Sequence, residues 1–204
     1  MSRTELAMRI LSAEGKISMG RLKKGDLDTE GWTNLATLQG RIDSAPLFID
    51  DSPNMTLMEI RAKCRRLKQR NDLKLVVLDY LQLMSSGKKV ESRQQEVSEF
   101  SRSLKLLAKE LDVPVIALSQ LNRGSEQRTD KRPMVSDLRE SGSIEQDADM
   151  VILLHREDMY NPDSERVGEA DMIIAKHRGG PTRTIPLAFS GKYSRFNNMA
   201  NEAP

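Results

Sequence analysis

Residues 75–79 read Leu-Val-Val-Leu-Asp, a continuous apolar run that ends in a carboxylate. A short run of this kind is typical of a strand buried on both faces in a parallel sheet. The segment 91–111 follows, and its apolar residues recur at spacings of three and four, which predicts a long helix. A second apolar run, 113–118, completes a strand, helix and strand unit. Because parallel strands need such a crossover, this part of the chain predicts a parallel sheet.

The C-terminal part of the chain carries three further apolar runs. They predict strands at Met150 to Leu154, Met172 to Ala175 and Thr184 to Phe189. Pro186 lies within the last run, and proline cannot donate to a strand ladder, so we expect an edge position or a bulge there. The expected fold class is α/β, with a largely parallel sheet flanked by helices and closed by antiparallel C-terminal strands.

Helix-start signals occur at three places in the N-terminal third of the chain. Ser2 and Thr56 each begin a capping-box pattern, and Asp28 can cap a helix between them. Residues 47–49, which read Leu-Phe-Ile, predict a short strand.

The composition describes one globular domain of ordinary size. The 204 residues include 32 Lys and Arg against 30 Asp and Glu, so the bulk charge of +2 does not identify a nucleic-acid binder. The single cysteine, Cys64, permits no internal disulfide, and two histidines, His155 and His177, leave little material for a zinc site. No apolar run approaches the roughly 18 residues of a membrane span and no signal peptide is recognisable, so we expect a cytoplasmic protein without membrane contact.

Polar side chains follow three of the predicted strands, namely Asp79, Gln120, and Lys176 with Arg178. Ligands of open α/β sheets gather at the carboxyl ends of strands, so we expect these groups to be neighbours on one edge. A carboxylate there can hold Mg²⁺ on nucleotide phosphates, and two cations on the same side of a strand suit a polyphosphate. Simpler interpretations are helix capping or loop hydrogen bonds for the carboxylate, a hydrogen bond within a turn for the amide, and a solvated hairpin turn for the basic pair.

The phosphate-binding motif G-x-x-x-x-G-K-[ST] occurs nowhere in the 204 residues. Gly15-Lys16, Gly87-Lys88 and Gly191-Lys192 all lack the upstream glycine and the following Ser or Thr. Nucleotide hydrolysis also needs backbone N–H groups and a lysine on the β- and γ-phosphates. We therefore expect that a strand-end carboxylate alone does not support turnover.

Residues 137–149 mix Arg139, Gly142 and several acidic side chains ahead of a predicted strand. One interpretation is an ion-paired surface loop. The other is a loop whose arginine and main-chain N–H groups contact phosphates of single-stranded nucleic acid without reading its bases. Aromatic residues make up 4% of the chain, which disfavours base stacking as the main source of affinity.

Five segments, taken in order, closely resemble the replicative DnaB-type DNA helicases: 78–84, 104–111, 118–123, 137–149 and 173–182. The resemblance implies a partial RecA-like motor domain over residues 1–198 and a disordered tail over 199–204. In the intact family this motor belongs to a hexameric ring that moves along single-stranded DNA. The ring unwinds duplex DNA in the 5'-3' direction during replication, uses ATP with Mg²⁺, and has primase and a helicase loader as partners.

The resemblance assigns nucleotide roles by position. Asp79 matches the Walker B aspartate that serves Mg²⁺, and Gln120 matches the residue that couples the γ-phosphate to the DNA-binding loops. Arg9 aligns with an arginine that contacts the nucleotide. Lys176 and Arg178 match the basic pair that reaches the neighbouring subunit's γ-phosphate, with Arg178 as the arginine finger.

The resemblance also assigns DNA roles and implies a truncation. Arg139, Glu140 and Gly142 match the loop that grips the DNA backbone. Met1-Ser2 looks like the end of a Ser-Leu-Glu-Met-Ser stretch whose glutamate activates the attacking water. This glutamate, the P-loop and the N-terminal domain that binds primase are therefore expected to be missing.

We accordingly expect part of an ATP-dependent helicase, an enzyme by family, that is catalytically impaired when isolated. One alternative is a non-catalytic DNA-binding or ring-assembly module that keeps Arg178, and another is a fragment of a RecA or RadA recombinase. A sheet without its first strand and P-loop helix would also leave Leu75 to Leu78 uncovered.

Overall fold

The computed structural model describes residues 1–84 and 92–199, and the side chains of all of these except 139–141. The chain divides into two compact units. Unit 1 comprises Met1–Ser52, Arg156–Ala170 and Pro186–Pro204, and unit 2 comprises Pro53–His155 and Asp171–Ile185. A single domain over residues 1–198 stays a prediction, and residues 200–204 of the expected tail lie outside the described residues.

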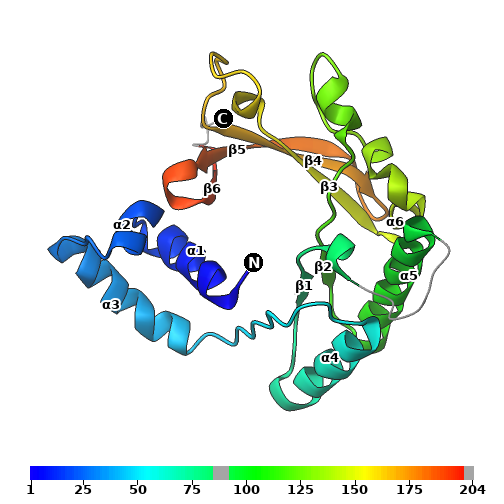
Figure 1. Cartoon of the computed structure of the whole chain (residues 1–204), viewed down its shortest axis with the longest axis horizontal. Coiled ribbons are helices and arrows are strands. Elements are labelled where there is room, and N and C mark those ends of the chain that lie inside the picture. The colour runs from blue at the N-terminus through cyan, green and yellow to red at the C-terminus, as the bar shows by residue number, and fades with distance from the viewer. Residues whose placement is uncertain (85–91, 200–204) are drawn as a thin grey trace. The chain divides into compact units, whose positions relative to one another are not determined.

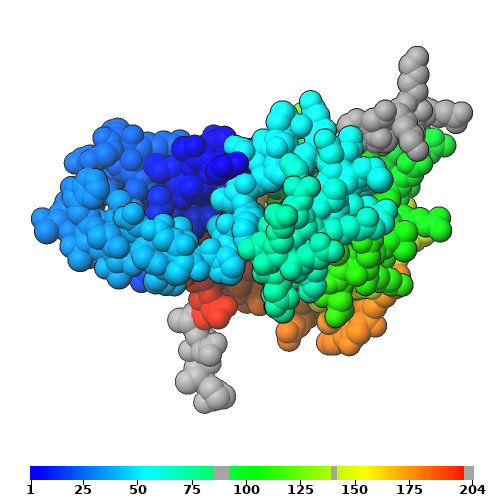
Figure 2. Space-filling model, turned by 90° about the horizontal axis from the view of Figure 1, so that it is seen from below, coloured from blue at the N-terminus to red at the C-terminus, as the bar shows by residue number. Residues whose placement is uncertain are grey.

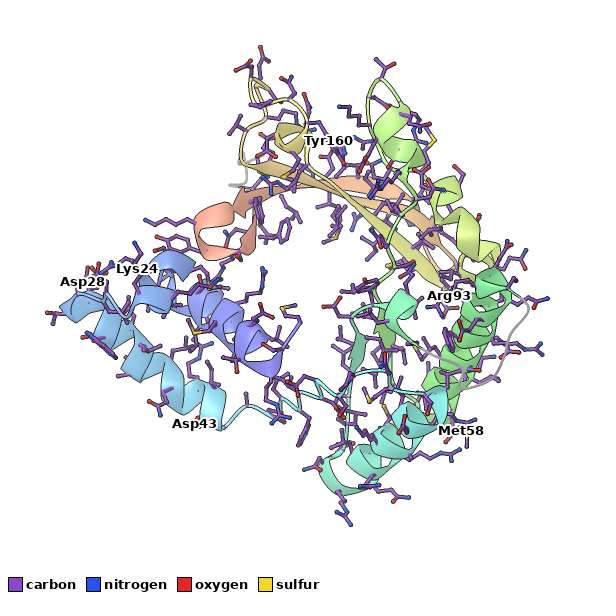
Figure 3. The ribbon with its side chains drawn as sticks, viewed as in Figure 1. Lys24, Asp28, Asp43, Met58, Arg93 and Tyr160 are labelled. Atoms are coloured by element: carbon purple, nitrogen blue, oxygen red, sulfur yellow. The ribbon has the colours of Figure 1, made fainter. Side chains whose placement is uncertain are left out.

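Unit 1 begins with three helices, α1 (Arg3–Gly15), α2 (Met19–Lys24) and α3 (Thr29–Asp43) (Figure 1). The predicted caps are confirmed. The hydroxyl of Ser2 accepts from the backbone N–H of Glu5 at 3.2 Å, and Asp28 accepts from the N–H of Gly31 at 2.8 Å. Figure 3 shows Asp28 at the start of α3. A capping oxygen in this position satisfies one of the N–H groups that the first helical turn leaves without a partner.

The strand predicted at residues 47–49 is not formed. The backbone there is irregular, and Leu47 and Phe48 are 54% and 48% exposed. A strand requires another backbone to pair with its N–H and C=O groups, and an apolar composition does not supply that partner.

Unit 2 contains a parallel strand pair with its crossover helix, as predicted. β1 (Val76–Leu78) pairs with β2 (Val115–Ala117), and α5 (Arg93–Leu111) connects them. α4 (Leu57–Asn71) precedes β1, and its predicted cap is confirmed by the bond from the Glu59 N–H to the Thr56 hydroxyl, at 3.3 Å. Figure 1 shows α4 and α5 beside the strand pair, and Figure 2 shows the outer surface of α4 in cyan to turquoise.

The core of unit 2 is built on one face of α5. Phe100 is 0% exposed and Leu107 is 1% exposed, and they pack with Ile60 and Cys64 of α4 and with Val76 of β1. Burial of an apolar side chain of this size stabilises the folded state by about 1.5–3 kcal/mol. Burial also raises the pKa of the Cys64 thiol. The helices in the described ranges all lack the length and apolar character that crossing a membrane would require.

The other face of the strand pair carries exposed apolar side chains. Leu75 and Val77 are 45% and 56% exposed, and Ile116 and Leu118 are 49% and 45% exposed. The prediction of a strand buried on both faces is therefore wrong. The expectation of uncovered apolar groups is confirmed for Leu75 and Val77 but not for Val76, which is 8% exposed. Val76 faces the core formed with α4 and α5, and strand alternation turns Val77 to the opposite side.

Antiparallel strands close the C-terminal part of the chain, as predicted. Their order in the sheet is β3 (Met150–His155), β4 (Glu169–His177), β5 (Arg183–Ser190) and β6 (Arg195–Asn198). β5 lies between β4 and β6, but β6 pairs with β5 only beyond Pro186, so the proline itself has the edge position that the sequence predicts. The pairing with β6 covers Leu187 to Ser190 and so begins just after the proline, which explains how the residue is accommodated.

Glu110 of α5 joins α5 to α4. Its Oε2 accepts from Nη2 of Arg61 at 2.9 Å, and its Oε1 accepts from Nε of Arg65. These bonds, that of Arg65 first, lower the pKa of Glu110 from 4.5 to about 2. The folded state therefore favours the ionised carboxylate more strongly than the unfolded chain does.

We predict that this contact makes stability depend on pH in a defined window. The contribution of Glu110 is fully present above its unfolded pKa of 4.5 and is lost as the pH falls toward about 2. Urea unfolding should show a lower free energy of unfolding for Glu110→Gln than for the wild type at neutral pH. This difference in free energy should shrink to zero near pH 2. A difference that does not change with pH would contradict the prediction. Asp43→Asn, which removes an exposed carboxylate of α3, serves as the control.

Candidate functional site

The carboxyl ends of β1 and β2 meet at an open hollow of about 370 Å³. It is lined by Asp79, Tyr80, Leu118, Ser119 and Gln120. Parallel pairing places the last residues of the two strands side by side, so the chain leaves both strands at the same edge. The carboxylate and the amide that follow these strands are therefore neighbours, as the sequence predicts.

Gln82 holds the two strand ends together. Its side-chain nitrogen donates to the hydroxyl of Ser119 at 3.1 Å, and its side-chain oxygen accepts from the backbone N–H of Gln120 at 3.3 Å. The backbone N–H of Leu81 also donates to the carbonyl of Leu118 at 2.9 Å. Gln82 was not among the predicted site residues, because contacts with residues 37 and 38 positions away leave no local pattern in the sequence.

The donor set of the hollow fits a magnesium ion that is shared with a nucleotide. Carboxylate, amide and hydroxyl oxygens from Asp79, Gln120 and Ser119 are the hard ligands that Mg²⁺ prefers. Among the side chains that the structure describes, which leave out those of 85–91, 139–141 and 200–204, no group of three His, Cys, Asp or Glu comes together in a way that could hold a metal. Mg²⁺ is commonly held by one or two carboxylates together with water and substrate phosphates, which requires no such group.

The basic pair lies elsewhere in unit 2, at the end of β4. Because β4 belongs to the antiparallel sheet, Lys176 and Arg178 are not on the sheet edge that carries the hollow, contrary to expectation. Lys176 donates through Nζ to the carbonyls of Glu145 and Gln146, the latter at 3.3 Å. Nη2 of Arg178 donates to the carbonyl of Gln146 at 2.7 Å. Both cations thus contact the end of the helix that follows the predicted DNA loop.

The predicted DNA loop leads into α6 (Gly142–Asp147). Gly142 opens this helix and is exposed. The side chains of Arg139 and Glu140 lie outside the described residues, and the backbone of both belongs to the short 3-10 helix η3 (Val135–Ser141). Their contact with DNA stays a prediction.

The segment that leads into this loop is anchored by an ion pair whose carboxylate is buried and whose guanidinium is partly exposed. Asp137 is 5% exposed and accepts from both Nη atoms of Arg128, one of them at 2.9 Å. The same carboxylate accepts from the backbone N–H of Met134 at 2.7 Å. These bonds, that of Arg128 first, hold the pKa of Asp137 below its usual value of 3.8. A second pair, Arg132 with Asp171 at 2.8 Å, attaches the segment to β4.

Arg9 lies in unit 1, on an exposed position of α1. The hollow, the basic pair and the DNA loop all belong to unit 2. The contact between Arg9 and a nucleotide therefore stays a prediction from the sequence.

Residues 1–198 match the family model of the DnaB-like helicase C terminal domain. A protein named replicative DNA helicase DnaB from Leifsonia xyli subsp. xyli (strain CTCB07) is 70% identical over 200 residues, which cover 98% of this chain and 44% of that protein. The protein of the same name from Geobacillus stearothermophilus is 56% identical, again with 98% and 44% covered. The chain thus spans less than half the length of these curated relatives.

Two solved structures share the fold with a TM-score of 0.93 and 43% sequence identity. One is described as the ATPase domain of G40P, and the match covers 98% of this chain and 72% of that chain. The other is described as the structure of a DnaB-like replicative helicase and its interactions with primase, and 49% of that chain is covered. These similarities confirm the predicted RecA-like α/β fold class.

We predict that Asp137→Asn destabilises the chain by about 2 kcal/mol, because it weakens the charge-assisted hydrogen bonds that the buried carboxylate accepts from Arg128 and from the Met134 N–H. Urea unfolding at neutral pH measures this change. Glu126→Gln, which alters an exposed carboxylate that precedes Arg128 in the same segment, should change stability by no more than about 0.5 kcal/mol. Equal effects of the two substitutions would show that the pair does not anchor the segment.

Proposed function

This chain belongs to the family of DnaB-like helicase C-terminal domains, and we propose that it forms part of the motor of a replicative DNA helicase. The proposed activity is ATP-dependent 5'-3' unwinding of duplex DNA during replication, performed in the cytoplasm by a hexameric ring of intact subunits. The observation that carries this proposal is the similarity of 98% of the chain to proteins named replicative DNA helicase. The same relatives count against the recombinase alternative.

The hollow at the ends of β1 and β2 is the proposed nucleotide and magnesium site. Asp79 is assigned to Mg²⁺ and Gln120 to the γ-phosphate, and their shared position in the hollow supports both assignments. A bound Mg²⁺ would neutralise developing negative charge on the phosphates. Gln82 keeps the two side chains on neighbouring loops by bonding to Ser119 and to the backbone of Gln120.

The basic pair is the proposed contact to a nucleotide held by a neighbouring subunit. The side chain of Arg178 is 54% exposed, so its guanidinium is accessible to another molecule. A guanidinium presents five N–H donors in a planar fork that matches a phosphate. Lys176 would add a second cation beside it, and Arg9 is assigned a further nucleotide contact.

The loop that contains Arg139, Glu140 and Gly142 is the proposed grip on the backbone of single-stranded DNA. The anchoring of the preceding segment by Arg128 and Asp137 supports a defined loop position. Primase and a helicase loader are proposed as partners of the intact protein, and one similar structure is described as showing interactions with primase.

A second candidate function is a non-catalytic module that enters a ring or binds DNA. It is favoured by the lack of the phosphate-binding motif in a chain that keeps the basic pair and the loop. The two functions differ in a mixing experiment with a full-length relative. A module should lower the unwinding rate when added in excess, and Arg178→Ala should abolish this inhibition.

We predict that the 204-residue chain alone hydrolyses almost no ATP, since it lacks the P-loop lysine. A ring in which residues 1–198 replace the matching segment of the Leifsonia xyli relative should unwind a forked duplex with ATP. In that ring, Asp79→Asn and Arg178→Ala should each lower DNA-stimulated ATP hydrolysis about 100-fold or more, because each removes electrostatic stabilisation of the transferring phosphoryl group. Glu126→Gln should leave the rate unchanged, and normal unwinding by the Asp79→Asn ring would refute the assignment.

We also predict that the chain binds oligothymidine weakly and in a strongly salt-dependent way. Each phosphate contact lowers the slope of log affinity against log salt by about 0.7. Fluorescence anisotropy should show that Arg139→Ala makes the slope less steep by about one such contact. Arg66→Ala, which removes an exposed cation of α4, should leave the slope unchanged. Salt-independent binding would argue for base stacking and against the loop.

A further inference from the structure

The carbonyl groups at the end of α6 are contacted by the two cations of the basic pair. Lys176 donates to Glu145 and Gln146, and Arg178 donates to Gln146 at 2.7 Å. The last carbonyls of a helix have no partner within the helix, and they carry its partial negative charge. Lys176 and Arg178 therefore stabilise the end of α6, and the same hydrogen bonds hold the two side chains against the helix.

Asp149 follows α6 and joins three elements of unit 2. Its carboxylate accepts from Nζ of Lys105 on α5, and its Oδ1 lies 3.6 Å from Nη1 of Arg178. Its backbone carbonyl accepts from the backbone N–H of Arg178 at 2.9 Å. The hydrogen bond from Lys105, and then the charges of Arg178 and Lys176, hold the pKa of Asp149 below 3.8. The carboxylate is thus ionised and lies beside the guanidinium.

We infer that Asp149 is a positioning residue, which holds Arg178 against α6 until a polyphosphate anion replaces it. This inference rests on the phosphate-contacting role proposed above for Arg178. One Nη of the guanidinium faces the Gln146 carbonyl and the other faces Asp149, so a phosphate that binds through both Nη groups competes with these two partners. Asp149 and Arg178 are 62% and 54% exposed, so their ion pair is weak enough to be exchanged.

The replacement of Asp149 by a phosphate at Arg178 would affect the predicted DNA loop. α6 is six residues long, so the Gln146 carbonyl that Arg178 contacts lies about one helical turn from Gly142, where the loop enters the helix. The hydroxyl of Ser143 donates to that of Ser98 on α5 at 2.8 Å, and this bond holds the start of α6 in place. Figure 1 shows α6 beside α5. Withdrawal of Arg178 and Lys176 to a phosphate would take the two cations from the last carbonyls of α6, while the start of the helix stays attached to α5.

The test is a titration of the ¹⁵N-labelled 204-residue chain with tripolyphosphate, followed by NMR. In the wild type, the Nε–H signal of Arg178 and the amide signals of Glu145 to Asp147 should shift with one common midpoint. Asp149→Asn should lower this midpoint by about two- to fivefold, the size expected from removal of an exposed competing carboxylate. Asp149→Glu, which keeps the charge, should stay near the wild type. The double variant Asp149→Asn with Arg178→Ala should not show this lower midpoint.

The matched control is Glu110→Gln. It also removes a carboxylate that pairs with two cations of unit 2, Arg61 and Arg65, and it lies on a different contact. The inference would be overturned if Glu110→Gln lowered the tripolyphosphate midpoint as much as Asp149→Asn does, or if Asp149→Asn left the midpoint unchanged. If Arg178→Ala alone binds tripolyphosphate like the wild type, the proposed phosphate role of Arg178 fails instead. If Arg178→Ala loses binding and Asp149→Asn changes nothing, the proposed function stands and only the role of Asp149 is lost.

Discussion

Phe100 and Leu107 have almost no exposed surface, so α5 can lie only with this face against α4 and β1. The helix is also the crossover between β1 and β2, and its burial therefore fixes the two strands as parallel neighbours. That arrangement brings Asp79 and Gln120 to one hollow. Outside its buried face the same helix carries Lys105, which contacts the segment after α6. The proposed nucleotide site and the basic pair thus depend on the packing of a single helix.

Much of the local structure could be predicted because its causes are local. The caps at Ser2 and Thr56 depend on residues three positions further along, and the buried face of α5 follows from the spacing of its apolar side chains. The strand expected at 47–49 failed because its formation depends on a partner backbone. The burial expected for Val77 failed for a related reason, since a run of apolar residues does not reveal how many faces of the sheet are covered.

The candidate site was predictable where it follows from strand ends and was missed where it follows from distant contacts. Asp79 and Gln120 come together because parallel strands end at one edge. Gln82 reaches a residue 37 positions away, and Asp149 accepts from a lysine 44 positions away, so neither contact leaves a local pattern. The basic pair was found by its spacing on β4, but its present partners, the carbonyls of α6, depend on how β4 pairs with β3.

Cys64 packs in the core between α4 and α5, and it is the single cysteine of the chain. Burial raises the pKa of its thiol, which keeps the reactive thiolate scarce and shields the sulfur from reagents in solution. An alkylating dye can therefore attach only in the moments when α4 separates from α5. Without any engineering, the rate of dye attachment reports how often the helix pair that packs on β1 opens, with nucleotide or DNA present or absent.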